Sequence, residues 1–303
     1  MNPPASPSPA AARRGFAYGL AAYGLWGVLP VYFKAIDGVA AVDIVAHRIL
    51  WSLPFLLILL TASRAWNEVA EALKHSRTLI LLLVTSVLIG TNWLLYVYAV
   101  TSGHILAASL GYYLNPLANV LLGRFVLKER LGRLQWAAVA IAAAGISALA
   151  AGALGQLWIS LVLCVSFAAY GLLRKVSSVD AVAGLAVETA MLAPLAMAWL
   201  AWGLASAAPV FGTSTTESVL LALAGIVSTT PLLLFTAAAR RLRYSTLGML
   251  QFIAPTLQFL LAVLVYGERF GVAHAIAFGA IWTALALYLF ALAREPRAPT
   301  PPE

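Results

Sequence analysis

Charged side chains and cysteine are what this sequence has least of. Only 10% of its 303 residues are Asp, Glu, Lys or Arg, whereas soluble proteins carry about 25%, so a soluble globular fold is excluded. The one cysteine, Cys164, lies inside an apolar run. This excludes a disulfide within the chain and a cysteine-based metal site, and we expect no metal and no other cofactor.

The sequence also lacks the residue patterns of catalysis. It contains no His-Glu-x-x-His, Gly-x-Ser-x-Gly or Cys/His cluster, and Asp37, Asp43 and Asp180 lie at the ends of apolar runs rather than within them. An intramembrane enzyme therefore stays an alternative without a candidate active site. A passive channel is a second alternative, for which the sequence shows no ring of charges or carbonyl groups that would act as a filter.

Apolar residues fill most of the chain. They make up 62% of it and give a mean hydropathy of +0.92, and one membrane crossing takes about 20 such residues. The Pro-rich segments 1–12 and 295–303 predict two disordered tails. Between them, ten apolar runs predict an all-α integral membrane protein with helices at 15–33, 43–62, 78–100, 104–127, 134–151, 155–173, 181–203, 218–239, 244–266 and 272–292.

Lysine and arginine gather between alternate helices. With both termini inside, only Lys34 and Arg269 of the 19 basic residues fall in outer loops, and Arg48 falls within the second helix. Because short cytoplasmic loops are rich in Lys and Arg, we expect a membrane protein with both its N-terminus and its C-terminus in the cytoplasm. The net charge of +8 then reflects contact with the lipid bilayer and not with nucleic acid. The expected cytoplasmic basic residues are Arg13, Arg14, Arg64, Lys74, Arg77, Arg124, Lys128, Arg130, Arg133, Arg174, Lys175, Arg240, Arg241, Arg243, Arg294 and Arg297.

An internal repeat appears when the chain is shifted by 139 residues. At this offset Thr91 aligns with Thr230, and the uncommon residues Pro, Glu, Arg and Gly align without gaps. The sequence thus predicts two five-helix repeats at 13–152 and 153–294, and since five is odd, the second repeat enters the membrane from the opposite side. The four aligned pairs are Pro116 with Pro255, Glu129 with Glu268, Arg130 with Arg269, and Gly132 with Gly271.

The matched prolines fall near the centres of two predicted helices. Pro116 and Pro255 each remove a backbone hydrogen bond, so we expect each to kink or loosen its helix. Interrupted helices at matched depths in inverted repeats are typical of secondary transporters, which bind substrate near the midplane and alternate access between the two sides. Membrane helices also tolerate proline elsewhere, and this chain uses it freely.

Several long segments carry a resemblance to a known family. The chain resembles the ten-helix drug/metabolite transporters of the EamA type, and within them the RarD branch. The resemblance implies two five-helix repeats, a bacterial inner-membrane location and the export of small metabolites or drugs, without naming a substrate. The segments are AHRILWS (46–52), LIGTNWLLYVYAV (88–100), ASLGYYLNPLANVLLG (108–123), AAYGLLRK (168–175) and RLRYSTLGMLQFIAPTLQFLLAVLVYGE (241–268).

Neutral polar and aromatic residues within the predicted helices are candidates for lining a substrate cavity. Those at 112, 115, 116 and 119 share one helix face, and Tyr112 and Asn119 align with Gln251 and Gln258 in the repeat. Hydrogen bonds between helices, or packing for the aromatic rings, explain each residue singly. The candidates are Tyr23, Trp26, Asn92, Trp93, Tyr112, Tyr113, Asn115, Pro116, Asn119, Gln251, Pro255 and Gln258.

Three ionisable residues lie within predicted helices, where charge is expensive. Arg48 either extends to the outer headgroups or places a positive charge at an outer vestibule, and His47 beside it is either a hydrogen-bonded core group or a titrating one. Glu188 is a candidate for proton coupling, because desolvation favours the protonated carboxyl. Helical rise places Glu188 roughly 10 Å or more from Arg48, so we expect no ion pair between these two residues, and Glu188 is either protonated or separately paired.

Two further patterns have structural explanations. Glu129 and Glu268 end their helices, where we expect each carboxylate to favour the N-terminus of the helix that follows, with Gly132 and Gly271 permitting the turn. The small-residue run 137–145 predicts close packing, against a neighbouring helix or in a possible homodimer.

Overall fold

The computed structural model describes residues 9–36, 38–101, 104–150, 155, 157–206, 211–265 and 272–294. Within these ranges every regular element is a helix and none is a strand. The elements are α1 (Pro9–Lys34), α2 (Ala41–Ala62), α3 (Trp66–Lys74), α4 (Ser76–Thr101), α5 (Ile105–Phe125), α6 (Arg133–Ala150), α7 (Leu157–Val176), α8 (Ala181–Ala205), α9 (Thr215–Ala239), α10 (Tyr244–Gln251), α11 (Ile253–Leu260), the π-helix η2 (Leu261–Val265) and α12 (Val272–Ala293).

Membrane-spanning character follows from these helices. A helix satisfies all its backbone hydrogen bonds internally, which a chain in lipid must do. Within the described ranges, seven segments are long and apolar enough to cross a bilayer, and this agrees with the expected all-α membrane class. They are Val42–Ala62, Ser76–Ala99, Leu157–Val176, Ala181–Ala205, Thr215–Ala239, Tyr244–Val265 and Ala275–Ala293.

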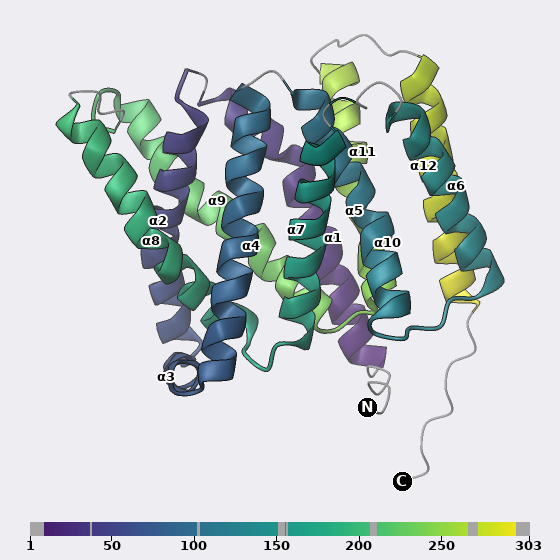
Figure 1. Cartoon of the computed structure of the whole chain (residues 1–303), viewed down its shortest axis with the longest axis horizontal. Coiled ribbons are helices and arrows are strands. Elements are labelled where there is room, and N and C mark those ends of the chain that lie inside the picture. Colours follow the sequence, from purple (N-terminus) through teal and green to yellow (C-terminus); the bar gives the residue numbers. More distant parts are fainter. Residues whose placement is uncertain are drawn as a thin grey trace.

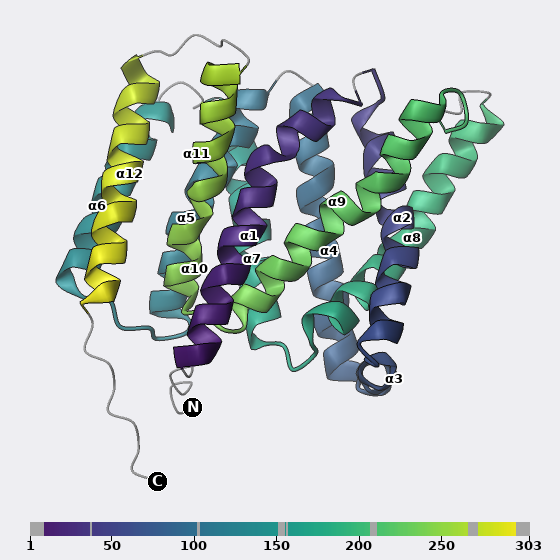
Figure 2. The same ribbon diagram turned by 180° about the vertical axis from the view of Figure 1, so that it is seen from behind.

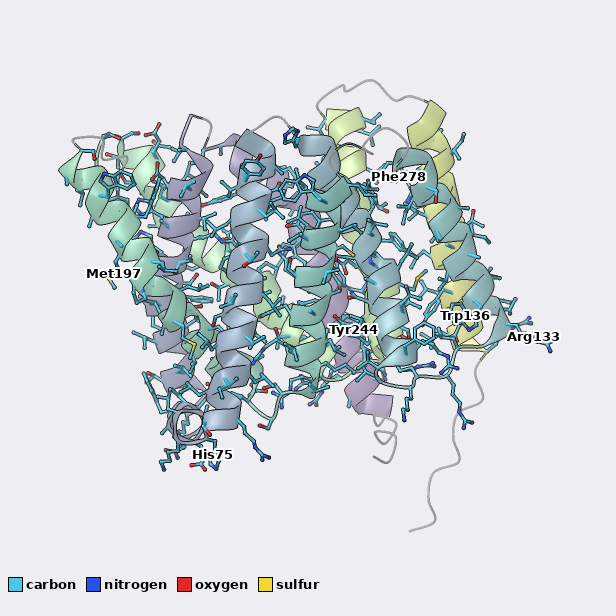
Figure 3. All side chains as sticks on the ribbon, viewed as in Figure 1. His75, Arg133, Trp136, Met197, Tyr244 and Phe278 are labelled. Carbon is cyan, nitrogen blue, oxygen red and sulfur yellow. The ribbon has the colours of Figure 1, made fainter. Side chains whose placement is uncertain are left out.

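The long helices run side by side between two ends of the molecule (Figures 1 and 2). The first residue of α1 and the last residue of α12 lie at one end, the lower end of Figure 1. The connections α2–α4, α5–α6, α7–α8 and α9–α10 lie at this same end. These connections hold most of the basic residues, and Figure 3 labels His75 and Arg133 there.

Two boundaries differ from the sequence predictions. The segment 1–12 was expected to be disordered, yet α1 begins at Pro9, so residues 9–12 are helical; residues 1–8 and 295–303 lie outside the described residues. The connection after α2 contains the short helix α3, which the search for long apolar runs missed. Its exposed Trp66 and Leu73 and its charged residues make it amphipathic, as in helices that lie along a membrane surface.

The two matched prolines act differently on their helices. The predicted helix 244–266 is interrupted at Phe252, between α10 and α11, three residues before Pro255. This is where proline is expected to act, because its ring clashes with the carbonyl four residues earlier. In contrast, α5 runs unbroken from Ile105 to Phe125 with Pro116 inside it, so the expected loosening is not seen as a break there.

Glu129 stabilises a helix other than the expected one. Its carboxylate accepts hydrogen bonds from the backbone N–H groups of Tyr244 (2.5 Å) and Ser245 (3.0 Å), and from the Ser245 hydroxyl (2.6 Å). It therefore caps α10, which comes much later in the chain, and not α6, which follows it. The start of α6 has its own partner, since the Gly132 N–H donates to the Gln135 side chain at 2.8 Å.

The turn before α6 also corrects a prediction. Gly132 does not have the positive φ that favours glycine; Lys128 does, with φ 56°. Glu268 and Gly271, the aligned residues of the second repeat, lie outside the described residues.

The small-residue run 137–145 packs within the chain. It lies on α6, which packs against α12, and a Cβ added at Gly145 would come within 2.6 Å of the Ala280 Cβ. Only glycine permits this close approach. The run thus packs against a neighbouring helix of the same chain, and a homodimer stays a prediction.

The largest core cluster takes in residues of α1, α2, α3, α4, α7, α8, α9, α10 and α11. Its centre is aromatic: Phe235 lies 5.1 Å from Phe167, 5.8 Å from Trp26 and 6.3 Å from Tyr23 between ring centroids. Tyr23 and Trp26 are thus packed against other rings, as their structural interpretation had it. The core joins α1, from the first predicted repeat, to helices from the second.

Candidate functional site

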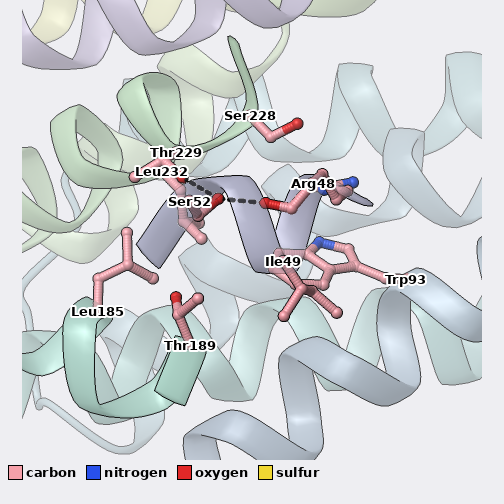
Figure 4. Close-up of a pocket in the computed structure, with 9 residues that line it drawn as sticks. All are labelled: Arg48, Ile49, Ser52, Trp93, Leu185, Thr189, Ser228, Thr229 and Leu232. Atoms are coloured by element: carbon pink, nitrogen blue, oxygen red, sulfur yellow. Dashed lines mark hydrogen bonds between the residues drawn. The ribbon is translucent and has the colours of Figure 1, made fainter. Parts of the chain in front are cut away.

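A small pocket lies between α2, α4, α8 and α9 (Figure 4). Its cavity volume is about 10 Å³ and it is partly open, which leaves room for about one water molecule. Sites for drug-sized ligands are much larger, about 300–1,000 Å³, so in this conformation the side chains of the pocket almost fill it. Its lining residues are Arg48, Ile49, Ser52, Trp93, Leu185, Thr189, Ser228, Thr229 and Leu232.

Arg48 supplies the charge of this pocket. It lies on α2, about 10 Å along the helix from its first residue at 1.5 Å per residue. Its Cζ lies 4.1 Å from the centroid of the Trp93 ring on α4, and Figure 4 shows the guanidinium next to that ring. Among the described residues the guanidinium has no ion pair. A cation over a tryptophan face is stabilised by about 0.5–2 kcal/mol, which does not neutralise its charge.

Hydroxyl groups line the pocket beside Arg48. The Thr229 hydroxyl donates to the Ser52 Oγ at 2.6 Å, and Ser52 in turn donates to the backbone carbonyl of Arg48 (Figure 4). This link holds α2 against α9 where the two backbones approach closely, since a Cβ at Gly225 would lie 2.5 Å from the Ser52 nitrogen. The pocket is therefore lined by both hydroxyl and apolar side chains (Figure 4).

A second charged cluster is buried between α4, α7 and α8. Arg174 Nε lies 3.6 Å from Glu188 Oε1, and their side chains are 0% and 1% exposed. The Thr85 hydroxyl donates to Glu188 Oε1 at 2.5 Å, and the Tyr170 hydroxyl donates to Oε2 at 3.2 Å. Both carboxylate oxygens thus have a donor and the carboxylate has a counter-ion, as a buried charge requires.

Local sequence explains how Arg174 fits into this cluster. Tyr170 and Arg174 are four residues apart on α7 and so share one helix face. Gly184 on α8 leaves the space for the guanidinium, because a Cβ there would lie 2.1 Å from Arg174 Nη1. Arg174 Nη2 also donates to the Asp180 carbonyl at 3.0 Å, just before α8 begins.

The positions of Arg48 and Arg174 bear on the prediction that Glu188 does not pair with Arg48. The absence of an ion pair between Glu188 and Arg48 is confirmed for these described residues, and Glu188 is separately paired, with Arg174. The sequence analysis missed this partner because the charge pattern placed Arg174 among the loop residues. Two features of the sequence could have indicated this pair. Tyr170 lies one turn before Arg174 on the same helix, and the next helix, α8, carries Glu188 within an apolar run.

The predicted cavity amides form hydrogen bonds between helices. The Asn92 side chain donates from Nδ2 to the Leu163 carbonyl at 2.9 Å, and its Oδ1 accepts a hydrogen bond from the Tyr112 hydroxyl at 3.2 Å. Asn119 Nδ2 donates to Gln251 Oε1 at 3.0 Å, and the Gln258 amide donates to the Trp26 carbonyl at 3.0 Å.

The face of α5 that carries residues 112, 115, 116 and 119 packs closely on α10. A Cβ at Gly248 would lie 2.8 Å from the Pro116 carbonyl oxygen. The side-chain amide of Asn115 is buried without a hydrogen-bond partner among the described residues.

Of the candidates from the sequence, the pocket brings together only Arg48 and Trp93. His47 is buried and stacks on Phe211, 5.2 Å between ring centroids, outside the pocket lining. Tyr113 packs against Phe278 on α12. The hydroxyl residues Ser52, Thr189, Ser228 and Thr229 were missed, because single Ser and Thr residues in apolar helices give no signal of their own.

Comparisons with known proteins bear on this arrangement. The EamA-like transporter family matches residues 13–151. Protein RarD of Escherichia coli (strain K12) is 45% identical, with 91% of this chain and 94% of that protein covered. An uncharacterized transporter of Vibrio cholerae is also 45% identical, with 91% and 92% covered.

More distant relatives extend the likeness. The chloramphenicol-sensitive protein RarD of Pseudomonas aeruginosa is 34% identical, with 90% of this chain and 93% of that protein covered. A solved structure titled "Crystal structure of protein" has a TM-score of 0.71 at 21% identity, covers 93% of this chain and 99% of that chain, and so shares the fold. The chain belongs to the RarD branch of the EamA-type drug/metabolite transporter superfamily and is a multi-pass membrane transporter.

Proposed function

We propose that this protein is a secondary transporter of the bacterial inner membrane that exports small metabolites or drugs by alternating access. In this proposal ten helices cross the bilayer, with both termini in the cytoplasm. The repeats 13–152 and 153–294 are inverted copies, and the substrate cavity forms between them. The helices α1, α2, α4, α5 and α6 make the first repeat, and α7, α8, α9, α10–α11 and α12 make the second.

The observation that carries the proposal is the exchange symmetry of helix packing. Three packing pairs join corresponding helices of the two repeats: α2 with α8, α5 with α10, and α6 with α12. Six further contacts form three swapped couples. α1 packs on α9 as α7 packs on α4, α1 packs on α11 as α7 packs on α5, and α2 packs on α9 as α8 packs on α4. A two-fold relation between the repeats accounts for all of these contacts, and this relation lets the two repeats exchange conformations.

The position of the basic residues supports the proposed orientation. The connections at the lower end of Figure 1 hold Arg64, Lys74 and Arg77, then Arg124 to Arg133, and then the groups at 174–175 and 240–243. Short loops rich in Lys and Arg face the cytoplasm. The lower end is therefore the cytoplasmic end in this proposal, and the Arg48 pocket lies toward the periplasmic end.

Transport is tested by efflux. Cells that express the protein are loaded with a panel of amino acids and amphipathic drugs, and efflux is compared with cells that express a variant with Gly225→Leu. This change places a side chain where the α9 backbone meets α2, so it prevents the repeats from closing on each other. Faster efflux of at least one compound, lost in the variant, is the expected result; equal efflux for the whole panel contradicts the proposal.

Topology is tested separately with reporter fusions. A reporter fused after Arg297 is expected to be active in the cytoplasm, and one fused after Thr213, between α8 and α9, is expected to be active in the periplasm. The second fusion is the matched control for the first. Activity of both reporters on the same side contradicts the proposed number of crossings.

A further inference from the structure

Arg48 and Arg174 both lie within the helix bundle, and among the described residues only Arg174 has a carboxylate beside it. Arg174 lies 3.6 Å from Glu188. Every ion pair of the described ranges involves other residues than Arg48. Charge within a membrane is retained only where something compensates for its desolvation, and no carboxylate of the described residues does so for Arg48, which leaves its guanidinium able to bind the anionic group of a ligand.

The surroundings of Arg48 are built to accept such an anion. The Trp93 ring covers one face of the guanidinium at 4.1 Å, and Arg48 is part of the pocket lining. The hydroxyl groups of Thr189 and Ser228 also line the pocket, and neither makes a hydrogen bond to another described residue. Arginine and hydroxyl donors together match a carboxylate, which accepts two parallel hydrogen bonds from a guanidinium.

The rest of the lining indicates what is attached to the anionic group. Ile49, Leu185 and Leu232 complete the pocket with apolar surface. Asp and Glu are absent from the described lining, so an ammonium group placed here faces the Arg48 charge without a carboxylate of its own. The lining therefore favours a compound with one carboxylate and an apolar body over amines and over zwitterions.

We propose that Arg48, together with Thr189, Ser228 and the Trp93 face, forms the recognition site for the carboxylate of an amphipathic monoanion, and that such compounds are the cargo class. The inference rests on the proposed transport function and names the chemistry of its substrate. In this conformation the cavity volume is about 10 Å³, roughly the room of one water molecule, so in this proposal the carboxylate enters when the two repeats move apart.

Binding to the purified full-length protein tests this assignment. Matched pairs of ligands are compared by quenching of tryptophan fluorescence: butyrate with butyramide, phenylacetate with phenylacetamide, and indole-3-acetate with indole-3-acetamide by a thermal-shift readout. We expect at least one carboxylate to bind at least tenfold more tightly than its amide. Equal affinity within all three pairs overturns the assignment, whatever the variants show.

Variants locate the anion. Arg48→Gln is expected to lose the preference for the carboxylate, and Arg48→Lys is expected to retain part of it, because a lysine keeps the charge without the paired donors. Arg241→Gln is the matched control, since Arg241 also lies over an aromatic ring, that of Tyr18, at 5.4 Å and outside the pocket lining. A preference that survives in a folded Arg48→Gln protein contradicts the site. Should that variant not fold, the preference within the wild-type pairs and its reduction in Arg48→Lys decide the question.

Counterflow in proteoliposomes separates this inference from the proposed function. Preferential binding of carboxylates without any counterflow contradicts transport and leaves the binding site standing. Counterflow of amides and carboxylates at equal rates, unchanged in Arg48→Gln, supports transport and contradicts the carboxylate site.

Discussion

The two ends of the molecule are held together by different chemistry. At the lower end of Figure 1, where the basic connections lie, charged groups find partners. Arg240 binds Asp180 at 2.6 Å, Lys175 donates to the Ala239 carbonyl at 2.8 Å, and Glu129 caps α10. Toward the upper end the described residues form hydrogen bonds and no ion pair: Tyr32 donates to the Leu220 carbonyl, and the Trp199 indole donates to the Asp43 carboxylate.

This difference separates charges that hold the fold from a charge that is left for a ligand. A buried pair such as Arg174 and Glu188 compensates for its own desolvation. Among the described residues, Arg48 has the Trp93 ring over its guanidinium and no ion pair. In the alternating-access proposal, ionic and capping contacts thus close the lower end. The Arg48 charge lies in the half of the molecule that faces the periplasm.

The largest expected effect comes from breaking the buried pair. Arg174→Met leaves the Glu188 carboxylate without its counter-ion, and Glu188→Leu leaves the guanidinium without its carboxylate. Removing one partner of a buried pair costs about 3–5 kcal/mol, so we expect each single variant to lose a comparable part of its free energy of unfolding, measured in detergent.

The double variant supplies the control. Arg174→Met with Glu188→Leu removes both charges, and replacement of a whole buried pair by apolar residues is often neutral. We therefore expect the double variant to regain most of the lost stability. Additive losses in the double variant would show that the two charges act independently, and the comparison between the two ends would then have no basis.

An intermediate effect is expected at Glu129. Glu129→Ala removes an acceptor of two backbone N–H groups and one hydroxyl at the start of α10. Loss of a helix cap costs about 0.5–2 kcal/mol, and we expect a decrease of this size in the free energy of unfolding. Glu71→Ala on α3 is the matched control, because its partners Lys74 and His75 are exposed; an equal effect of the two changes contradicts the capping role.

The sequence predicted the class of fold and the spacing of its long helices, because lipid imposes a length and an apolar composition that are visible residue by residue. It did not predict partners that are distant in the chain. Glu129 was assigned to the nearest helix start, whereas the start of α10, 115 residues further along, receives it. Helix ends that are adjacent in sequence and helix ends that are adjacent in space differ once two repeats interlock.

Side-chain roles within the helices were harder to predict for a related reason. The stripe around Asn119 was correctly placed on one face of α5, but that face meets α10 through the Asn119–Gln251 bond. Periodicity tells which residues share a face and says nothing of which neighbour covers it. Arg48 was recognised because a charge in an apolar run is rare, whereas Ser228 and Thr189 in the same pocket were not.

The smallest effect on the free energy of unfolding is expected at Arg48. This variant is the most direct test of the difference between the two ends of the molecule. Arg48→Met removes a charge that has no carboxylate partner among the described residues, so no opposite charge is stranded. The lost contact with Trp93 is worth about 0.5–2 kcal/mol, and relief from burying a charge offsets it. We expect the free energy of unfolding to change by less than about 1 kcal/mol by this balance, and we expect phenylacetate or indole-3-acetate to stabilise the wild type but not the variant. A loss as large as that of Arg174→Met would mean that Arg48 is a structural charge like Arg174, and that the two ends of the molecule do not differ in the way proposed.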